Sequence, residues 1–152
     1  MLPKTADYAL RAVVWMGREP ELAQSASHLA ERTRVPRHYL HKVLQDLVRA
    51  GLVRSQPGPG GGYSLTRSAE EITILDVVNA VGELERIDRC PMGLTERECP
   101  HAPPSATLCT LHRELDNVYA AAQEALRRVT IASLNCSSSE SIVPVNGAAP
   151  SP

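Results

Sequence analysis

Residues 25–51 read SASHLAERTRVPRHYLHKVLQDLVRAG and contain two helical patterns separated by only a few residues. The first pattern predicts a helix over 26–33 with Ser25 as its N-cap. The second predicts a helix over 36–50, with proline at its first position and Gly51 as its stop. Two short helices joined by so tight a turn indicate a helix-turn-helix. The second helix carries the apolar stripe of a core-facing helix, made of Leu40, Val43, Leu44, Leu47 and Val48.

A β-hairpin is predicted directly after this unit. Leu52–Ser55 and Tyr63–Thr66 are short strand-like pieces, and the Gly/Pro-rich tip QPGPGGG lies between them. A hairpin that follows a helix-turn-helix in this way is a wing. The tip is not a nucleotide-binding phosphate loop, since no Gly-Lys-Ser/Thr follows it and no βαβ repeat surrounds it.

Two further helices complete the predicted domain. One is expected over Thr5–Gly17 with Thr5 as N-cap, and the other over Ile74–Val81 between a Thr73 cap and a glycine stop. Residues 1–82 are therefore expected to form a winged helix-turn-helix domain, mainly α with a small β-hairpin. Its core is expected to be aliphatic, because aromatic residues make up only 3% of the 152 residues and there is no Phe.

The net charge of −1 averages two unlike parts of the chain. Residues 1–63 hold nine basic and five acidic residues, a net +4, while residues 64–152 hold seven and twelve, a net −5. The basic first part favours a polyanionic partner. The chain contains no run of about 18 apolar residues, so no membrane span is predicted. The first residues lack the apolar stretch of a signal peptide, so we expect a cytoplasmic chain without a membrane partner.

The outer face of the second helix offers the donors and acceptors that contact with double-stranded DNA requires. Arg54 at the base of the wing and Gly60 at its tip are further candidates for DNA contact. The alternative is a solvated polar face, which the helix-turn-helix and wing context disfavours. The helix candidates are Arg37, His38, Tyr39, His41, Lys42 and Gln45.

Three cysteines fall in or at the edge of a Pro-rich loop over 83–107. Cys90, Cys99 and Cys109 are spaced C-x8-C-x9-C, and His112 follows three residues later. Thiolates bind both iron–sulfur clusters and zinc, but structural zinc sites usually contain close C-x2-4-C pairs. The spacing therefore favours an iron–sulfur cluster and leaves zinc, a redox disulfide or unrelated thiols as alternatives. The fourth cysteine, Cys136, is interpreted as an incidental thiol.

Residues 108–135 predict one long helix with an apolar heptad pattern, long enough for a two-helix interface. The expected role is homodimerisation, and the alternative is a long helix packed on its own domain. Residues 136–152 are small, polar and Pro-rich, and are expected to be a disordered tail. The predicted interface residues are Leu108, Leu111, Leu115, Val118, Ala122, Ala125 and Val129.

Enzymatic function is not expected. The sequence contains no C-x-x-C pair, no nucleophile–base motif and no cofactor-binding glycine loop. A thiol-redox enzyme, or a cluster carrier that uses its winged helix for protein contacts, is the lesser alternative.

Five features carry a resemblance to a known family: TADYALR at Thr5–Arg11, Tyr39-Leu40, AGLV at Ala50–Val53, GPGGGY at Gly58–Tyr63, and the three-cysteine loop. Together they resemble the IscR/NsrR family, bacterial winged-helix transcription regulators that carry an iron–sulfur cluster. The resemblance covers about residues 1–134.

The resemblance implies a [2Fe-2S] or [4Fe-4S] cluster bound by Cys90, Cys99 and Cys109. The fourth ligand would be His112, as in the cluster-biogenesis branch, or Asp7 of the partner subunit, as in the nitric-oxide-sensing branch. It implies a homodimeric repressor that binds operator DNA and senses nitric oxide, redox or iron–sulfur status. No small-molecule substrate is implied.

Three features depart from the family pattern. Arg34 stands where the turn often has Gly, which adopts a left-handed conformation more easily. Pro57 stands where members often have an Arg that enters the minor groove, with Arg54 as a possible substitute. The spacing of the cysteine loop is longer than in familiar members.

Overall fold

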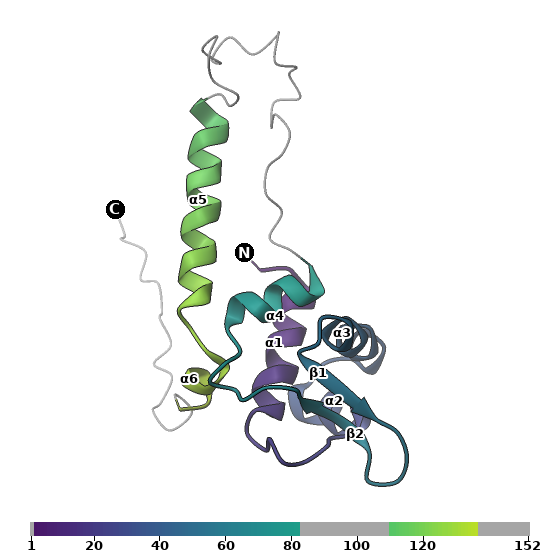
Figure 1. Cartoon of the computed structure of the whole chain (residues 1–152). Helices are drawn as coiled ribbons and strands as arrows, with labels where there is room; N and C mark the ends of the chain where they lie inside the picture. The colour runs from purple at the N-terminus through teal and green to yellow at the C-terminus, as the bar shows by residue number, and fades with distance from the viewer. Residues whose placement is uncertain (1, 83–109, 137–152) are drawn as a thin grey trace, which may run out of the picture.

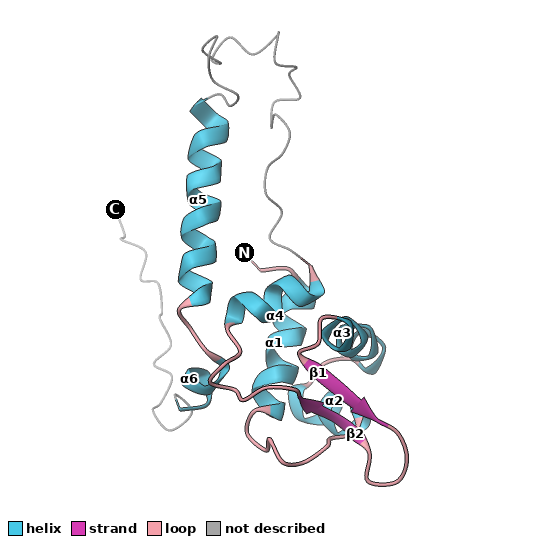
Figure 2. Ribbon diagram, in the orientation of Figure 1, coloured by secondary structure: helices cyan, strands magenta, loops and turns pink. Residues whose placement is uncertain are grey.

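The structure, a computed structural model, describes residues 2–82 and 110–136. Four helices and a two-stranded antiparallel hairpin form the first part, and two further helices follow (Figures 1 and 2). The fold is a winged helix-turn-helix, as the sequence predicts. The predicted loop over 83–107 and the tail after Cys136 lie outside the described residues. The elements in chain order are α1 (Lys4–Met16), α2 (Ala26–Thr33), α3 (Arg37–Arg49), β1 (Val53–Gln56), β2 (Gly62–Leu65), α4 (Ile74–Val81), α5 (Thr110–Arg127) and α6 (Ile131–Cys136).

The helix-turn-helix depends on well-formed helix ends. Ser25 caps α2 by accepting a hydrogen bond from the backbone N–H of His28 at 3.2 Å. Helix α3 ends in a Schellman motif: the N–H of Gly51 donates to Val48 O and that of Leu52 to Leu47 O, both at 3.0 Å, with Gly51 at φ 75°. The predicted Ser25 cap and Gly51 stop are confirmed.

The start of α1 differs from the sequence prediction. The helix begins at Lys4 with Pro3 as N-cap, and no side chain caps it. Thr5 lies inside the first turn, so its predicted role as N-cap is wrong. The φ of Pro3, −57°, suits a helix start, and its carbonyl accepts from the N–H of Asp7 at 3.1 Å.

The wing is held on both of its sides. Within it, β1 pairs antiparallel with β2, with Val53 opposite Leu65 and Gln56 opposite Gly62. Outside it, Tyr63 and Gln24 exchange two backbone hydrogen bonds, at 2.8 and 2.9 Å. Gly62 is required at this junction, because a Cβ there would lie 2.5 Å from the carbonyl of Gln24. The wing is thereby attached to the residue that precedes the Ser25 cap.

The core is aliphatic, as predicted. It lies between α1, α2, α3, α4 and the inner side of the wing. Among its fully buried side chains are Met16, Leu29, Leu40, Leu44, Leu47 and Ile72.

The prediction of one helix over 108–135 is wrong. Helix α5 ends at Arg127, and α6 begins at Ile131. Between them the backbone hydrogen-bonds to residues 69–74: Ile74 N–H to Val129 O, Ile131 N–H to Ile72 O, and Ala132 N–H to Ala69 O, each at 2.9 Å. Ile131 is fully buried in the core of its own chain. The last apolar residues of the pattern therefore pack into the domain of their own chain.

Within the described ranges, no helix is long and apolar enough to cross a membrane.

Candidate DNA interface

Helix α3 presents its predicted DNA-contacting face to solvent. Its buried side fixes the orientation, because Leu40, Val43, Leu44 and Leu47 are each at most 1% exposed. The polar candidates on the other side are all exposed: Arg37, His38, Tyr39, His41, Lys42 and Gln45. A helix held by an apolar stripe, with donors and acceptors outward, can enter a major groove.

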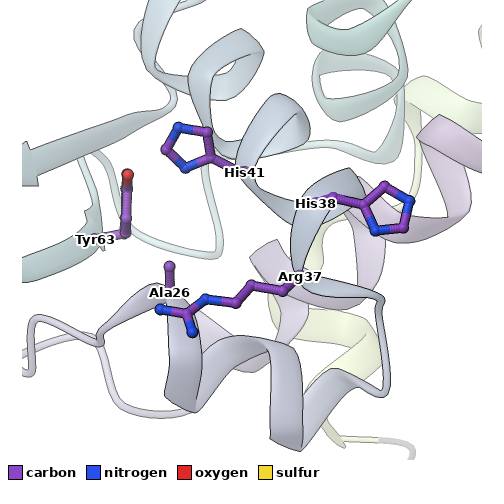
Figure 3. Close-up of a pocket in the computed structure, with 5 residues that line it drawn as sticks. All are labelled: Ala26, Arg37, His38, His41 and Tyr63. Atoms are coloured by element: carbon purple, nitrogen blue, oxygen red, sulfur yellow. The ribbon is translucent and has the colours of Figure 1, made fainter.

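A shallow open pocket of about 780 Å³ connects α3 with the wing (Figure 3). None of its lining side chains is acidic, and four of them can donate hydrogen bonds. In Figure 3, His41 extends on the side of Tyr63, whereas His38 points away from it. Tyr63 and Ala26 are not among the DNA-contact residues predicted from the sequence, because only the fold brings them beside α3. The lining residues are Ala26, Arg37, His38, His41 and Tyr63.

Tyr39 is held between two other rings although its side chain is 48% exposed. Its ring centroid lies 4.0 Å from that of His38 and 5.8 Å from that of Tyr8 on α1. The contact with Tyr8 packs the ring of Tyr39 against α1, while about half of the residue stays exposed.

Helix α3 has one acidic side chain, Asp46, and it forms an ion pair. Asp46 contacts Arg49 at 2.8 Å, and that contact lies at the C-terminal end of the helix. Closer to the pocket, Gln45 Nε2 lies 3.2 Å from His41 Nε2. The face bearing Arg37 and Lys42 therefore has a net positive charge, which suits contact with phosphates.

On the wing, Arg54 donates from Nε to Ser64 Oγ at 2.9 Å, across the strand pair. This bond holds the guanidinium along the hairpin. Gly60 lies at the exposed tip with φ 77°. Both candidates therefore lie on the solvent-facing part of the wing.

The candidate cluster ligands are only partly within the described residues. Cys90, Cys99 and Cys109 lie outside them, as does the side chain of His112. In the parts of the chain that are described, no group of three or more His, Cys, Asp or Glu side chains is placed to hold a metal ion. Asp7 is described: it lies in the first turn of α1, about half exposed, and contacts Arg11 at 2.8 Å.

Helix α5 carries a row of apolar side chains that the described residues leave largely uncovered. We call Leu111, Leu115, Val118, Ala122 and Ala125 the α5 row. Leu111 is 44% and Val118 65% exposed. Of the other predicted interface residues, Leu108 lies outside the described residues, and Val129 follows the end of α5 and is half-buried.

The fold and this surface define a winged helix-turn-helix DNA-binding protein. The chain belongs to the Rrf2 family, described as iron-dependent transcriptional regulators, whose match covers residues 2–136. It is thus a helix-turn-helix transcriptional regulator, and the resemblance drawn from the sequence motifs is confirmed.

Individual relatives agree with this assignment. The chain is 33% identical to BadM of Rhodopseudomonas palustris, over 88% of this chain and 80% of BadM. BadM is named as an HTH-type transcriptional regulator. It is 27% identical to a protein of the same named class from Aquifex aeolicus, over 86% of this chain and 88% of that one.

Two solved structures share the fold. IscR of T. potens has a TM-score of 0.68 at 23% identity, covering 88% of this chain and 85% of that one. CymR, the global cysteine regulator of B. subtilis, has a TM-score of 0.66 at 24% identity, covering 90% of this chain and 96% of CymR.

Proposed function

We propose that the chain is a homodimeric repressor whose affinity for operator DNA is set by an iron–sulfur cluster. The observation that carries this proposal is the position of the three cysteines. Cys90, Cys99 and Cys109 all fall in the segment that joins α4 to α5, and Cys109 immediately precedes Thr110, where α5 begins. A cluster bound there would join the DNA-binding domain to the α5 row.

The available donors suit such a group. Three thiolates from one segment are ordinary ligands for an iron–sulfur cluster, and a carboxylate or imidazole can complete the set. Asp7 is a suitable fourth ligand, because its carboxylate has a hydrogen-bonding partner, Arg11, at 2.8 Å while about half of the side chain remains exposed. Ligating carboxylates commonly carry such a hydrogen-bonding partner. We propose that the fourth ligand is either His112 or Asp7 of the partner subunit.

The α5 row supports the proposed homodimer. Leu111 and Val118 are large apolar side chains that face solvent in a single chain, and they repeat at heptad spacing along α5. A second copy of α5 packed against this row would cover them. The dimer would then present two α3 helices, as two half-sites of an operator require.

In this proposal the DNA contacts are divided between α3 and the wing. Arg37 and Lys42 would contact phosphates, while Gln45 and His41 would contact base edges. Arg54 and Gly60 would follow the backbone or the minor groove. Loss or chemical change of the cluster, by nitric oxide or an oxidant, would alter the segment before α5 and shift the two α3 helices relative to the operator. The proposal assigns the chain neither enzymatic turnover nor a small-molecule substrate.

Anaerobic purification tests the cluster. We expect visible absorbance, iron and acid-labile sulfide in the wild type, and the loss of all three in Cys99→Ser. Cys136→Ser is the matched control and should retain them. The optical and resonance spectra of Asp7→Ala and His112→Ala then identify the fourth ligand as the residue whose loss alters the cluster.

Other results would replace the proposal. One zinc ion per chain without sulfide would indicate a zinc site. A metal-free protein that loses two free thiols on oxidation would indicate a thiol switch between loop cysteines. Operator binding that is identical with and without the cluster would refute its regulatory role.

A further inference from the structure

The strongest unassigned feature of the α3 surface is a hydrogen-bonded pair one helical turn apart. Gln45 Nε2 lies 3.2 Å from His41 Nε2, and both side chains are exposed. An amide nitrogen only donates, so Gln45 donates one N–H and His41 accepts it with an unprotonated Nε2. Within the described residues, Gln45 forms no other side-chain hydrogen bond.

This bond changes what the amide of Gln45 can still offer to DNA. A free glutamine amide has two N–H donors and one carbonyl acceptor. With one donor taken by His41, Gln45 retains one N–H and its carbonyl oxygen. In the major groove, adenine presents a donor at N6 beside an acceptor at N7, whereas guanine presents two acceptors, O6 and N7.

We infer that His41 sets Gln45 to recognise adenine and to discriminate against guanine in the operator. The remaining N–H of Gln45 donates to adenine N7, and its carbonyl accepts from N6. Guanine would place a second acceptor, O6, opposite the carbonyl oxygen of Gln45. The inference rests on the proposed function, since it requires that α3 enter the major groove.

The surroundings of the pair support this role. Gln45 lies on the face of α3 opposite the buried Leu40 and Leu44, and His41 lies at the edge of that face; both side chains are exposed. Lys42 lies between them in sequence and is exposed, in a position to contact a phosphate while the pair contacts a base. The pocket that His41 lines extends this surface to the wing.

Selection from a duplex library with 20 randomised base pairs, using the anaerobically purified full chain, tests the inference. We expect the wild-type motif to contain an adenine position that disappears with Gln45→Ala. On the selected duplex, changing that A·T pair to G·C should weaken wild-type binding by roughly 5- to 150-fold. Replacing the adenine with 7-deazaadenine should weaken it as well, because N7 is removed.

The His41→Ala variant examines the pairing itself. It should still bind, but its preference for adenine over guanine should fall to within roughly 3-fold, because Gln45 regains its second donor. His28→Ala, which removes an exposed histidine of α2 outside the pair, should leave the preference unchanged. If wild-type protein retains no duplex, both the proposed function and this inference fail. If it selects a motif that Gln45→Ala leaves unchanged, or if His41→Ala keeps the full preference, only the inference is refuted.

Discussion

Replacement of Arg34 by glycine should stabilise the protein. Arg34 follows the last residue of α2 and has φ 56° and ψ 31°, the left-handed conformation. It is the only non-glycine residue with positive φ among residues 2–82 and 110–136. This conformation reverses the chain between α2 and α3, so the helix-turn-helix cannot form without it. The side chain of Arg34 is exposed.

The size of the effect follows from two opposing terms. An L-residue in the left-handed region costs about 1–2 kcal/mol relative to the right-handed region. Glycine avoids this cost, but ordering a more flexible residue costs about 0.5–1 kcal/mol. The net expectation for Arg34→Gly is a gain of about 0.5–1 kcal/mol in the free energy of unfolding. At this chain length, that gain raises the melting temperature by about 1–4 °C.

Denaturant and thermal unfolding at one fixed protein concentration measure this gain, since the concentration affects the stability of any dimer. Glu31→Gly is the matched control, because it places the same residue at an exposed, right-handed position inside α2 and should lose about 1 kcal/mol. Arg34→Asn should give a smaller gain than Arg34→Gly, since asparagine tolerates the left-handed region better than arginine but keeps its Cβ. A loss of stability in Arg34→Gly equal to that in Glu31→Gly would refute the argument, because the cost would then not lie in the backbone conformation.

Four further changes have defined outcomes. Gly62→Ala should detach the wing from Gln24, because the new Cβ would lie 2.5 Å from its carbonyl, and hydrogen exchange at the paired amides should accelerate. Ile131→Ala should cost about 2–5 kcal/mol in denaturant unfolding, since the side chain is fully buried; a surface-like cost would mean that α6 is not docked in solution. Val118→Glu should dissociate the proposed dimer in sedimentation experiments while the monomer stays folded, and an unchanged mass would refute the α5 interface. Lys42→Ala should weaken binding to all sequences alike and reduce the salt slope by about one, so an altered sequence preference would contradict its phosphate role.

The winged helix-turn-helix was predictable because its signals are local. The Ser25 cap, the α3 stripe and the Gly51 stop each depend on neighbours within one or two turns. The structure has all three, except that Val48 of the predicted stripe is exposed. The start of α1 was missed because threonine is the commoner cap, whereas the chain uses Pro3 with no side-chain hydrogen bond. That choice depends on backbone geometry, which residue type alone does not specify.

The candidate DNA interface was predictable in part for the same reason. The outward face of α3 follows from helical periodicity, so its six candidates were found and are exposed. The contributions of Tyr63 and Ala26 to the pocket were not, because they depend on how the wing packs beside α2 and α3. The bond between His41 and Gln45 could have been suspected from their spacing of four, which places side chains together on a helix.

The break between α5 and α6 shows why apolar periodicity cannot identify the partner of a helix face. Spacings of three and four continue through Val129 and Ala132, yet the chain leaves the helix at Arg127. The local signal was the β-branched run Val129-Thr130-Ile131, which favours extended backbone. Pairing of this run with residues 69–74 then buries Ile131 in the domain.

This pairing also determines how α5 is connected to the DNA-binding surface. Residues 69–74 lie between β2 of the wing and the start of α4, and three backbone hydrogen bonds of 2.9 Å attach to them residues 129–132, which follow α5. A displacement of the C-terminal end of α5 would therefore either break these bonds or move residues 69–74, which connect the wing to α4. The cysteine-containing segment follows α4 and precedes Thr110, so it meets α5 at the end opposite to these bonds. Under the proposed function, a rearrangement before Thr110 would therefore have to move α5 as a whole to act on residues 69–74 and, through them, on the wing and α4.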